Sequence, residues 1–408
     1  MGGVTSYSAG KIDNCHNEGN ILFNNTGNIK GTCIGGIVCY QNGSITNCTN
    51  KGNITAYGKK FEGRNTIGSI DAGTNSTSSP APNFAGIVAL GYNSSGSPFA
   101  IDNCQNYGNI SYYWTEMDGS GTSGRTQLAG VICAPCGDVT NCQNYGDIVF
   151  ESSYTASVPN CYTYVGGVVA SDYYAKSQSE SSVYNCTNEG NIRLKVVAGS
   201  TNAAGGIIGW PGGESNCTNV TQGCVNKGDI VLEGEARVRL GGIQGGSGAI
   251  VDCVNEGDIT VNTTANNTVV GGLAGFHSGA FKLQNSVNTG NVVCNVPLSA
   301  GGVGGMTGNI GNAAHGEGVI ANNTINCIVK AAEGTCGVGM VCGHFNGKTK
   351  TIYFGSADQP LKIGGSLQIG DTTTAVTAAN VMDPAVLGAP NCSNFDAAWH
   401  LYNCVLAQ

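Results

Sequence analysis

The sequence predicts an all-β protein, a right-handed parallel β-helix of about ten coils with a small C-terminal cap. Three observations support this prediction. A short element with an Asn-Cys core occurs eight times, a Gly-aliphatic element occurs ten times, and the chain is rich in Gly and Asn with hardly any helical pattern. Repeats of roughly 30 to 45 residues with this character are typical of stacked solenoid coils.

The Asn-Cys element first appears at residues 14–21, as Asn-Cys-His-Asn-Glu-Gly-Asn-Ile. An aliphatic residue three positions before the Cys and another six positions after it, as at Ile12 and Ile21, predict strands on both sides of a turn. The sixth copy has Thr221 at the leading aliphatic position, which predicts a locally irregular coil. The Cys position is occupied by Cys15, Cys48, Cys104, Cys142, Cys186, Cys224, Cys253 and Ser286.

Inside this element an Asn is always followed two residues later by a Gly, as in Asn17 and Gly19. Asn tolerates the left-handed region and Gly supplies positive φ, so the pair predicts a tight turn. Coils stacked about 4.8 Å apart would also let equivalent Asn amides bond one another. The column consists of Asn17, Asn50, Asn106, Asn144, Asn188, Asn226, Asn255 and Asn288.

The second element is a Gly followed by an aliphatic residue. The residue three positions after each Gly is always small, from Ser6 and Cys39 to Gly305 and Cys342, which indicates a sterically confined position inside the coil. Ten starts predict about ten coils: Gly3, Gly36, Gly86, Gly130, Gly167, Gly206, Gly242, Gly272, Gly302 and Gly339.

Composition excludes some classes of partner. The net charge is −8 and the 18 Lys and Arg are scattered, so a nucleic-acid groove is not expected. No stretch has the 18 or more apolar residues of a membrane-spanning helix. Because Gly2-Gly3-Val4 already belongs to the repeat, we expect an excised or processed segment of a longer chain with flanking domains, Met1 being added by expression.

Nineteen Cys allow disulfides, metal sites or free thiols. Ser286 replaces one repeat Cys, and the small column exchanges Cys with Ala and Gly, which favours mostly free, buried thiols. The lone pair Cys133 and Cys136 is weak evidence for metal or redox chemistry, so no metal and no cofactor are predicted. Cys392 and Cys404 lie outside the repeat and could pair in an oxidising environment.

No catalytic residue is predicted. The five His do not share metal-ligand spacing, and the acidic residues that recur, such as Glu18 and Asp147, lie in the turn and exchange with Lys, Tyr or Asn in other copies. The alternative is a polysaccharide-active β-helix enzyme, either a glycoside hydrolase or a lyase. Such an enzyme would need a groove with two carboxylates about 5 to 10 Å apart.

Aromatic residues break the repetition. Ten of the 16 Tyr fall between Tyr107 and Tyr184, which suggests loops on neighbouring coils that present rings to a sugar or a protein. The alternative is that these rings only cover the flank of the solenoid. The candidate ligand-binding residues are Tyr112, Tyr113, Trp114, Tyr154, Tyr162, Tyr164, Tyr173 and Tyr174.

Residues 271–275 (Gly-Gly-Leu-Ala-Gly) and 205–209 (Gly-Gly-Ile-Ile-Gly), alternating with the Asn-Cys element, resemble the GLUG-type repeats of bacterial surface proteins. Similar repeats occur in the non-catalytic region of immunoglobulin A proteases. The resemblance covers roughly residues 1–345, and the tail looks like segments of secreted Bacteroidetes proteins. It implies export, surface display and adhesion, and it carries over no catalytic residue. The abundance of Cys departs from the pattern.

We therefore expect two regions, a β-helix over residues 1–345 and a C-terminal cap over residues 346–408 with a short helix around residues 377–387. The expected function is a non-enzymatic, extracellular or cell-surface adhesin that binds a host or environmental glycan or a surface protein through loops on the flank. The alternatives are the polysaccharide-active enzyme and a purely structural stalk.

Overall fold

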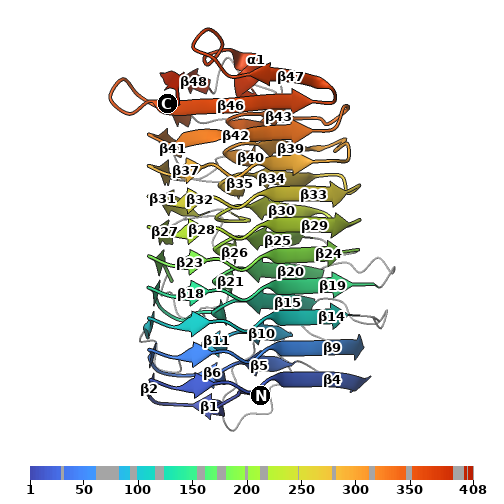
Figure 1. Cartoon of the computed structure of the whole chain (residues 1–408), viewed down its shortest axis with the longest axis vertical. Helices are drawn as coiled ribbons and strands as arrows, with labels where there is room; N and C mark the ends of the chain where they lie inside the picture. The colour runs from blue at the N-terminus through green and yellow to red at the C-terminus, as the bar shows by residue number, and fades with distance from the viewer. Residues whose placement is uncertain are drawn as a thin grey trace.

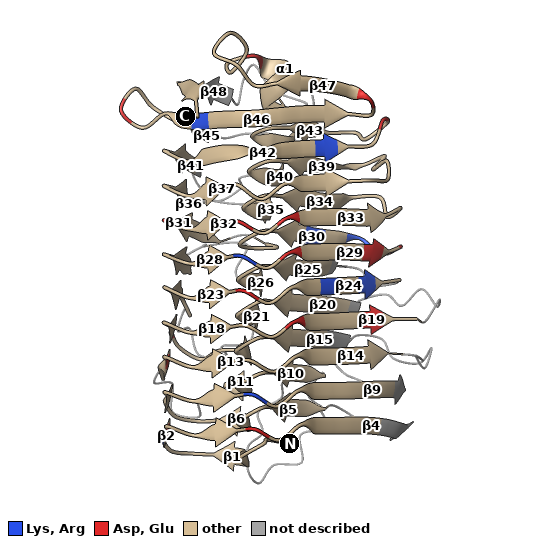
Figure 2. Ribbon diagram, viewed as in Figure 1, with Lys and Arg blue, Asp and Glu red and all other residues tan. Residues whose placement is uncertain are grey.

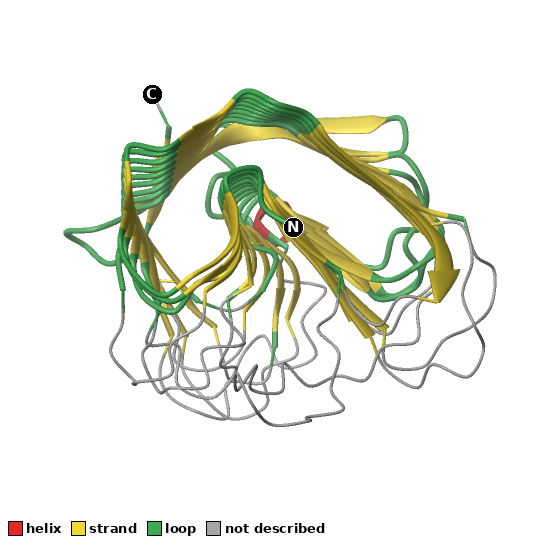
Figure 3. Ribbon diagram, turned by 90° about the horizontal axis from the view of Figure 1, so that it is seen from below, coloured by secondary structure: helices red, strands yellow, loops and turns green. Residues whose placement is uncertain are grey.

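A computed structural model shows short parallel strands stacked in columns along one axis, from the N-terminal coil to the C-terminal one (Figure 1). The structure describes residues 1–28, 32–60, 82–91, 99–114, 124–153, 161–171, 181–197, 201–211, 219–246, 248–277, 282–311, 318–345, 352–388, 399–401 and 403–407. Viewed along the axis, successive coils superimpose, and one corner of each coil points into the interior of the outline (Figure 3). The predicted parallel β-helix is confirmed.

Two stacks carry the Asn-Cys element. Here an 11-stranded sheet precedes the Cys position and a 20-stranded sheet, called the outer sheet below, follows it. The 11-stranded sheet contains β2 (Ile12–Asp13), β7 (Ile45–Thr46), β12 (Ile101–Asp102), β17 (Val139–Thr140), β22 (Val183–Tyr184), β27 (Val220–Gln222), β31 (Ala249–Val251), β36 (Lys282–Gln284), β41 (Gly318–Ala321), β45 (Ile352–Phe354) and β48 (Trp399–Leu401).

The outer sheet has a short and a longer strand in most coils. Its strands are β3 (His16–Asn17), β4 (Ile21–Asn28), β8 (Thr49–Asn50), β9 (Ile54–Lys60), β13 (Gln105–Asn106), β14 (Ile110–Trp114), β18 (Gln143–Asn144), β19 (Ile148–Ser152), β23 (Thr187–Asn188), β24 (Ile192–Val196), β28 (Val225–Asn226), β29 (Ile230–Gly234), β32 (Val254–Asn255), β33 (Ile259–Thr263), β37 (Val287–Asn288), β38 (Val292–Cys294), β42 (Thr324–Ala331), β46 (Leu361–Ile369), β47 (Thr372–Ala375) and β49 (Cys404–Leu406).

The Gly-aliphatic element forms the inward corner between two further stacks. The stack before the corner contains β5 (Cys33–Gly35), β10 (Asn83–Ala85), β15 (Gly124–Ala129), β20 (Cys161–Gly166), β25 (Thr201–Gly205), β30 (Val238–Gly241), β34 (Thr268–Gly271), β39 (Gly301–Gly304) and β43 (Val338–Gly339). The stack after it contains β1 (Thr5–Ser8), β6 (Val38–Gln41), β11 (Val88–Gly91), β16 (Ile132–Ala134), β21 (Val169–Ser171) and β26 (Ile208–Trp210), then β35 (Ala274–His277), β40 (Thr307–Ile310) and β44 (Cys342–Phe345).

The Asn column forms a continuous ladder of buried amides. In each of seven steps, from Asn17 to Asn288, the Nδ2 group donates to the Oδ1 atom of the next Asn at 2.7 or 2.8 Å. The same Nδ2 group also donates to the carbonyl oxygen two residues on, as from Asn144 to Gly146 at 2.8 Å. The predicted ladder is confirmed, and it satisfies polar groups that are buried from water.

The turn around this ladder differs from the prediction. The left-handed residue lies one position before the Cys, as at Asn14, Asn47 and Asn141, with φ between 51° and 55° at the Asn positions. Gly223 and Asp252 occupy the same position in the sixth and seventh copies. From the second copy on, the Gly after each ladder Asn is required by space instead: a Cβ on Gly52 would lie 2.0 Å from the Gly19 carbonyl oxygen.

The inward Gly corner packs directly against the Asn ladder. A Cβ on Gly167 would lie 2.0 Å from the Gly206 carbonyl oxygen in the next coil and 2.4 Å from Cγ of Asn188 in its own coil. The same double contact recurs from Gly36 with Asn50 to Gly272 with Asn288. The corner therefore needs Gly because a side chain there would displace both the next coil and the ladder.

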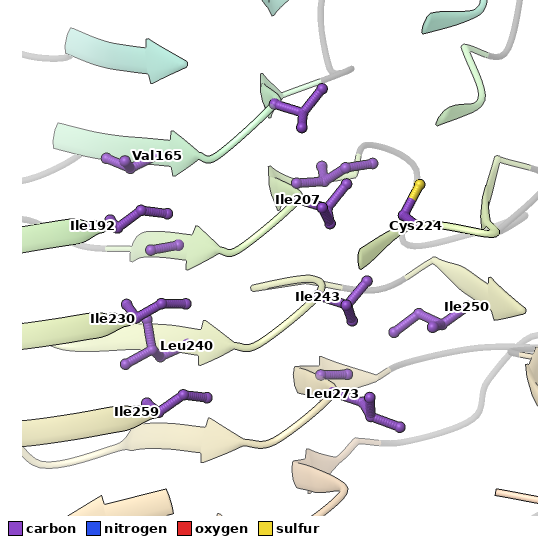
Figure 4. Close-up of a cluster of buried hydrophobic side chains, with 14 of the residues drawn as sticks. Val165, Ile192, Ile207, Cys224, Ile230, Leu240, Ile243, Ile250, Ile259 and Leu273 are labelled. Carbon is purple, nitrogen blue, oxygen red and sulfur yellow. The ribbon is translucent and has the colours of Figure 1, made fainter. Parts of the chain in front are cut away.

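Aliphatic columns fill the space on either side of this contact. Ile192, Ile230 and Ile259 come from successive coils of the outer sheet, and Ile207, Ile243 and Leu273 follow the Gly corner in successive coils (Figure 4). All six are buried completely. Stacking therefore gives each aliphatic side chain an equivalent neighbour above and below, as the repeat predicts.

Two expectations about the repeat need correction. The last two corner positions are Gly305 and Met340, since β34, β39 and β43 align Gly271 with Gly304 and Gly339. The coil with Thr221 is regular, because β27 pairs in register with β22 and β31. The irregularity lies at Gln244, which is joined to Ile208 in one neighbouring coil and to Ala274 in the other only by isolated bridges. The Nε2 group of Gln244 donates to Thr221 Oγ1 at 2.7 Å.

The expected region boundary at residue 345 is not an end of stacking. Strand β45 pairs with β41 and β46 pairs with β42, and β48 and β49 add a further layer. The elements that depart from the repeat are the antiparallel strand β47 and the helix α1 (Pro384–Leu387), which is shorter than expected and is capped by Asp383. The Val386 carbonyl oxygen accepts a hydrogen bond from Met340 N at 2.9 Å, so α1 covers the core beside β43.

The sixteen Cys whose side chains the structure describes are all free, as predicted for these positions. Their thiols donate to backbone carbonyls, as Cys133 Sγ does to Phe84 O at 3.2 Å and Cys136 Sγ to Gly91 O at 3.1 Å. Burial raises the pKa of Cys294 to about 11 and of Cys327 to about 12, so these thiols stay protonated at neutral pH. Cys404 is free, and Cys392 lies outside the described residues.

Replacing a column thiol by a hydroxyl should be tolerated. Ser286 already occupies the column, where its Oγ atom accepts from Cys253 N at 3.1 Å. We expect Cys186→Ser to lower the free energy of unfolding by less than about 1.5 kcal/mol in urea titrations. In the native wild-type protein, iodoacetamide should label the exposed Cys336 and the half-buried Cys15 faster than Cys142 or Cys186 in peptide maps. Equal labelling of all four would contradict the buried column.

One buried His makes stability sensitive to mild acid. His277 is completely buried, and burial lowers its pKa to about 3. The unfolded chain takes up a proton below about pH 6.5 while the folded chain does not, so stability falls as the pH falls. Between pH 7 and pH 5 we expect this group to cost about 2 kcal/mol of unfolding free energy. Urea titrations of wild type and His277→Gln should show a smaller loss in the variant, and equal losses would contradict the assignment.

Candidate functional site

The first three candidate residues belong to a strand and not to a loop. Tyr112, Tyr113 and Trp114 lie in β14, where side chains alternate between the core and the outside. Tyr112 is 4% exposed and packs on Phe84 at 4.6 Å between ring centroids, and Trp114 is 3% exposed. The structure therefore excludes both rings from a ligand-binding surface, because the strand period turns them into the core. Tyr113 faces outward.

The other candidates divide in the same way. Tyr164 in β20 is 3% exposed and stacks on Trp210 at 5.8 Å, while its neighbour Tyr162 is half-buried. Tyr164 thus belongs to a buried cluster beside the Gly corner. Tyr154, Tyr173 and Tyr174 lie outside the described residues.

Four tyrosines on the outside of the outer sheet form two stacked pairs. Tyr57 and Tyr113 are register partners in β9 and β14, with ring centroids 5.2 Å apart and an interplanar angle of 18°. Tyr107 and Tyr145 lie in the turns after β13 and β18, with centroids 4.6 Å apart and an angle of 8°. Stacking the coils in register brings these residues together. The exposed fractions of Tyr57 and Tyr107 are 42% and 44%.

Small polar residues separate the two pairs along the chain. The outward positions between them are Asn53 and Thr55 in one coil and Asn109 and Ser111 in the next. We call this surface the tyrosine strip, consisting of Tyr57, Tyr107, Tyr113 and Tyr145 with Asn53, Thr55, Asn109 and Ser111 between them. It lies across three neighbouring coils of the outer sheet, at β9, β14 and β19 (Figure 1).

Side-chain hydrogen bonds fix one end of the strip. The Tyr107 hydroxyl donates to Gln105 Oε1 at 3.0 Å, and the Tyr145 hydroxyl donates to Gln143 Oε1 at 2.6 Å. Gln105 Nε2 donates to Gln143 Oε1 at 3.4 Å, which links the two coils. Partial burial, together with the nearby Tyr107, raises the pKa of Tyr145. The result is a pre-ordered pair of rings.

The strip itself has few charges. Figure 2 shows no charged residue on β13 or β14, whereas acidic and basic residues appear on β19, β24 and β29. In the turn column, Lys51 pairs with Glu18 at 3.1 Å and Lys227 pairs with Glu189 at 2.8 Å. These two ion pairs lie on either side of the Tyr107–Tyr145 stack in the order of the coils.

The sequence reasoning missed Tyr57, Tyr107 and Tyr145. A signal was present: Cys-Gln-Asn-Tyr-Gly occurs in two successive copies, at residues 104–108 and 142–146, and in no other. Tyr57 and Tyr113 both lie three residues after the Ile that ends the Asn-Cys element, a position that the strand period turns outward. Aligning the repeats column by column would have found both pairs.

The recurrent acidic residues have structural partners. The Oδ1 atoms of Asp147, Asp229 and Asp258 accept backbone N–H groups of the next coil, at 2.8, 2.9 and 2.7 Å. The Oδ1 atoms of Asn53 and Asn109 likewise accept a backbone N–H group of the next coil, at 2.8 Å and 2.9 Å respectively. These carboxylates therefore belong to a second ladder. Over the part of the chain that the structure describes, no group of three or more His, Cys, Asp or Glu is placed to hold a metal ion.

The geometry defines a parallel β-solenoid repeat protein with an outward aromatic strip. Residues 30–55, which include the Gly36 corner and the second Asn-Cys element, match the family model of the GLUG motif. The predicted GLUG-type repeat is thus confirmed over that segment. No curated protein and no solved structure matches the chain. The likeness to immunoglobulin A proteases and to Bacteroidetes proteins stays a resemblance.

The described residues contain no helix that is both long and apolar enough to span a bilayer.

Proposed function

We propose that this chain is a non-enzymatic attachment protein of the cell surface or the extracellular space. The solenoid acts as a spacer, and the tyrosine strip binds a glycan or a surface protein. The observation that carries this proposal is that, in each of two pairs, an exposed Tyr ring stacks on a half-buried Tyr ring of the adjacent coil. Aromatic rings with polar tips on a rigid scaffold are typical of binding surfaces, where they lose little entropy on binding.

Two features support attachment over catalysis. The repeated Asp residues serve the second ladder, and each occupies a position that Asn takes in another coil. Between its tyrosines, the strip on the outer sheet presents hydroxyl and amide groups, and farther along that sheet the outward Glu233 is paired with Arg193 at 3.2 Å. The extracellular location rests on the GLUG resemblance, and complete burial of Cys104, Cys142 and Cys186 would protect these thiols from oxidants there.

Binding to an array of immobilised glycans and matrix proteins tests the proposal. We expect wild type to bind at least one class of immobilised ligand, and the double variant Tyr107→Ala/Tyr113→Ala to bind at least tenfold more weakly. Tyr7→Ala is the matched control, since Tyr7 is 56% exposed on β1, outside the strip. Unchanged binding by the double variant would favour a purely structural stalk.

A parallel assay for release of reducing sugars or unsaturated uronides tests the enzyme alternative. The attachment function predicts no turnover on polysaccharides that the protein binds. Turnover that is lost on replacing a pair of carboxylates would favour the glycoside hydrolase or lyase instead.

A further inference from the structure

The size of the tyrosine strip points to an extended ligand. Tyr113 lies six positions after Tyr107 in the same coil, three of them along β14, so at about 3.3 Å per residue the backbone allows at most about 20 Å between the two ring pairs. Tyr57 stacks on Tyr113 and Tyr145 stacks on Tyr107, so each end of the strip spans two coils. A single sugar or amino acid would reach only one pair. A ligand that uses the whole strip must therefore be a chain of several units.

The floor of the strip suits hydroxyl-rich ligands. The Oδ1 atoms of Asn53 and Asn109 are used by backbone N–H groups of the next coil, at 2.8 and 2.9 Å. Both side chains are exposed, and their Nδ2 groups make no hydrogen bond within the residues that the structure describes. With the half-buried Thr55 and Ser111 hydroxyls, they give a row of donors and acceptors between the aromatic pairs.

This floor differs from the centre of a stable protein–protein contact. Such centres are apolar and bury large side chains in pockets, with a total of about 1,200 to 2,000 Å². Between its aromatic ends, the strip offers Asn side chains from the turns before β9 and β14 and Thr and Ser side chains from these strands. That arrangement resembles a polar track more than a hydrophobic patch, which favours a glycan over a protein.

Charge around the strip disfavours an anionic ligand. Asp147 and Glu151 face outward in the coil next to Tyr107 and Tyr113, and Glu151 is the register partner of Tyr113. The Lys nearest in the turn column, Lys51, is already paired with Glu18. A uronic acid or sulfated polymer on the strip would meet these carboxylates, whereas the outward cations Arg193 and Lys195 lie one coil beyond the strip, in β24, where Arg193 is paired with Glu233 and Lys195 is the register partner of Glu151.

We infer that the tyrosine strip binds an uncharged glycan chain, lying along the strands of the outer sheet so that sugar units contact both tyrosine pairs. This inference rests on the proposed attachment function and specifies its ligand. Aromatic pairs provide apolar contact with sugar C–H faces, and the Asn, Thr and Ser side chains exchange hydrogen bonds with hydroxyl groups. Affinity should therefore depend little on salt.

Calorimetric titration of the full chain with matched hexasaccharides tests the inference. The probes are neutral gluco-, manno-, xylo- and galacto-hexaoses, an oligogalacturonate and a fully deacetylated chito-oligosaccharide, each at about 0.05 M and about 0.5 M salt. We expect at least one neutral probe to bind with less than twofold change in Kd between the two salts. The oligogalacturonate should bind at least tenfold more weakly. The matching neutral disaccharide should also be at least tenfold weaker.

Variants locate the binding and separate the possible failures. Tyr107→Ala and Tyr113→Ala should each weaken neutral binding at least fivefold, whereas Tyr7→Ala should leave it unchanged. Tighter, salt-dependent binding of either charged probe would overturn the inference that the ligand is uncharged, but attachment through the strip would stand. If no glycan binds while the double Tyr variant still loses attachment to a matrix protein, the glycan inference fails and the attachment function stands. If the Tyr variants alter neither, both fail.

Discussion

Gly167→Ala should destabilise the solenoid by about 4 kcal/mol. The backbone at Gly167 is not in the left-handed region, so the cost comes from space alone. Its new methyl group would lie 2.0 Å from the Gly206 carbonyl oxygen and 2.4 Å from Cγ of Asn188. Overpacking a rigid interior costs about 1 to 3 kcal/mol, and displacing Asn188 breaks buried hydrogen bonds that cost about 1 to 3 kcal/mol each.

The free energy of unfolding, measured by urea titration, checks this prediction. Gly10→Ala is the matched control, since a Cβ on Gly10 would meet no atom within 4 Å. We expect the control to change stability by less than about 0.5 kcal/mol. Hydrogen exchange should show the largest loss of protection in the coils around Gly167, because each coil contacts only its neighbours. Equal effects of the two substitutions would contradict the tight corner.

Asn144→Ala should cost about 3 kcal/mol. The substitution removes the acceptor of the Asn106 amide, and it removes the donor to Asn188 Oδ1 and Gly146 O, all at 2.8 Å. The site is completely buried, so water cannot replace these partners. The isosteric change Asn144→Asp should cost more at neutral pH, since a carboxylate oxygen would then face the oxygens of Asn188 and Gly146.

Urea titrations at two pH values separate the two effects. The loss of unfolding free energy in Asn144→Asp, relative to wild type, should shrink when acid protonates the carboxyl group. The loss in Asn144→Ala, relative to wild type, should be the same at both pH values. Asn24→Ala, at an exposed position of β4, is the control and should be nearly neutral. A cost below about 1 kcal/mol for Asn144→Ala would mean that the ladder contributes little to stability.

The columns of the fold were predictable because the same residue types recur at the same positions of each repeat. Asn17 to Asn288 and the Gly corner recur with the same neighbours, so a stack of coils follows directly. The turn was harder. Asn14, Asn17 and Gly19 could each have been the left-handed residue, and the structure shows that it is Asn14. The Gly of this turn is needed for close contact between coils, as between Gly52 and Gly19, and the sequence alone does not show that contact.

The end of the repeat could not be read from local pattern. Gly302 and Gly339 both precede an aliphatic residue, but the ladder partner of Asn288 in the next coil is Ile325, and the corner residue of the last aligned coil is Met340. The amide ladder stops one coil before the Gly corner does, because a Cβ on Gly305 would still lie 2.5 Å from the Met340 carbonyl oxygen and 2.8 Å from Ile325 Cγ2. Two of the aromatic candidates, Tyr112 and Trp114, point into the core because residues 110–114 form a strand of period two, where the sequence analysis expected a loop.

Spin-label distances along one outward column test the central claim, which is that coils stack in register. Thr55, Val149, Val231, Val293 and Lys330 occupy the same outward column. In a background with the solvent-reactive thiols replaced by Ser, paired Cys labels at 55 and 231, or at 149 and 293, span four coil steps of about 4.8 Å each, or about 19 Å. Labels at 55 and 330 span seven steps, or about 34 Å. Backbone separations derived from pulsed dipolar spectra should follow the number of coil steps between the labels, whatever number of residues lies between them. Separations that do not scale with the steps would contradict the stacking, and with it the tyrosine strip.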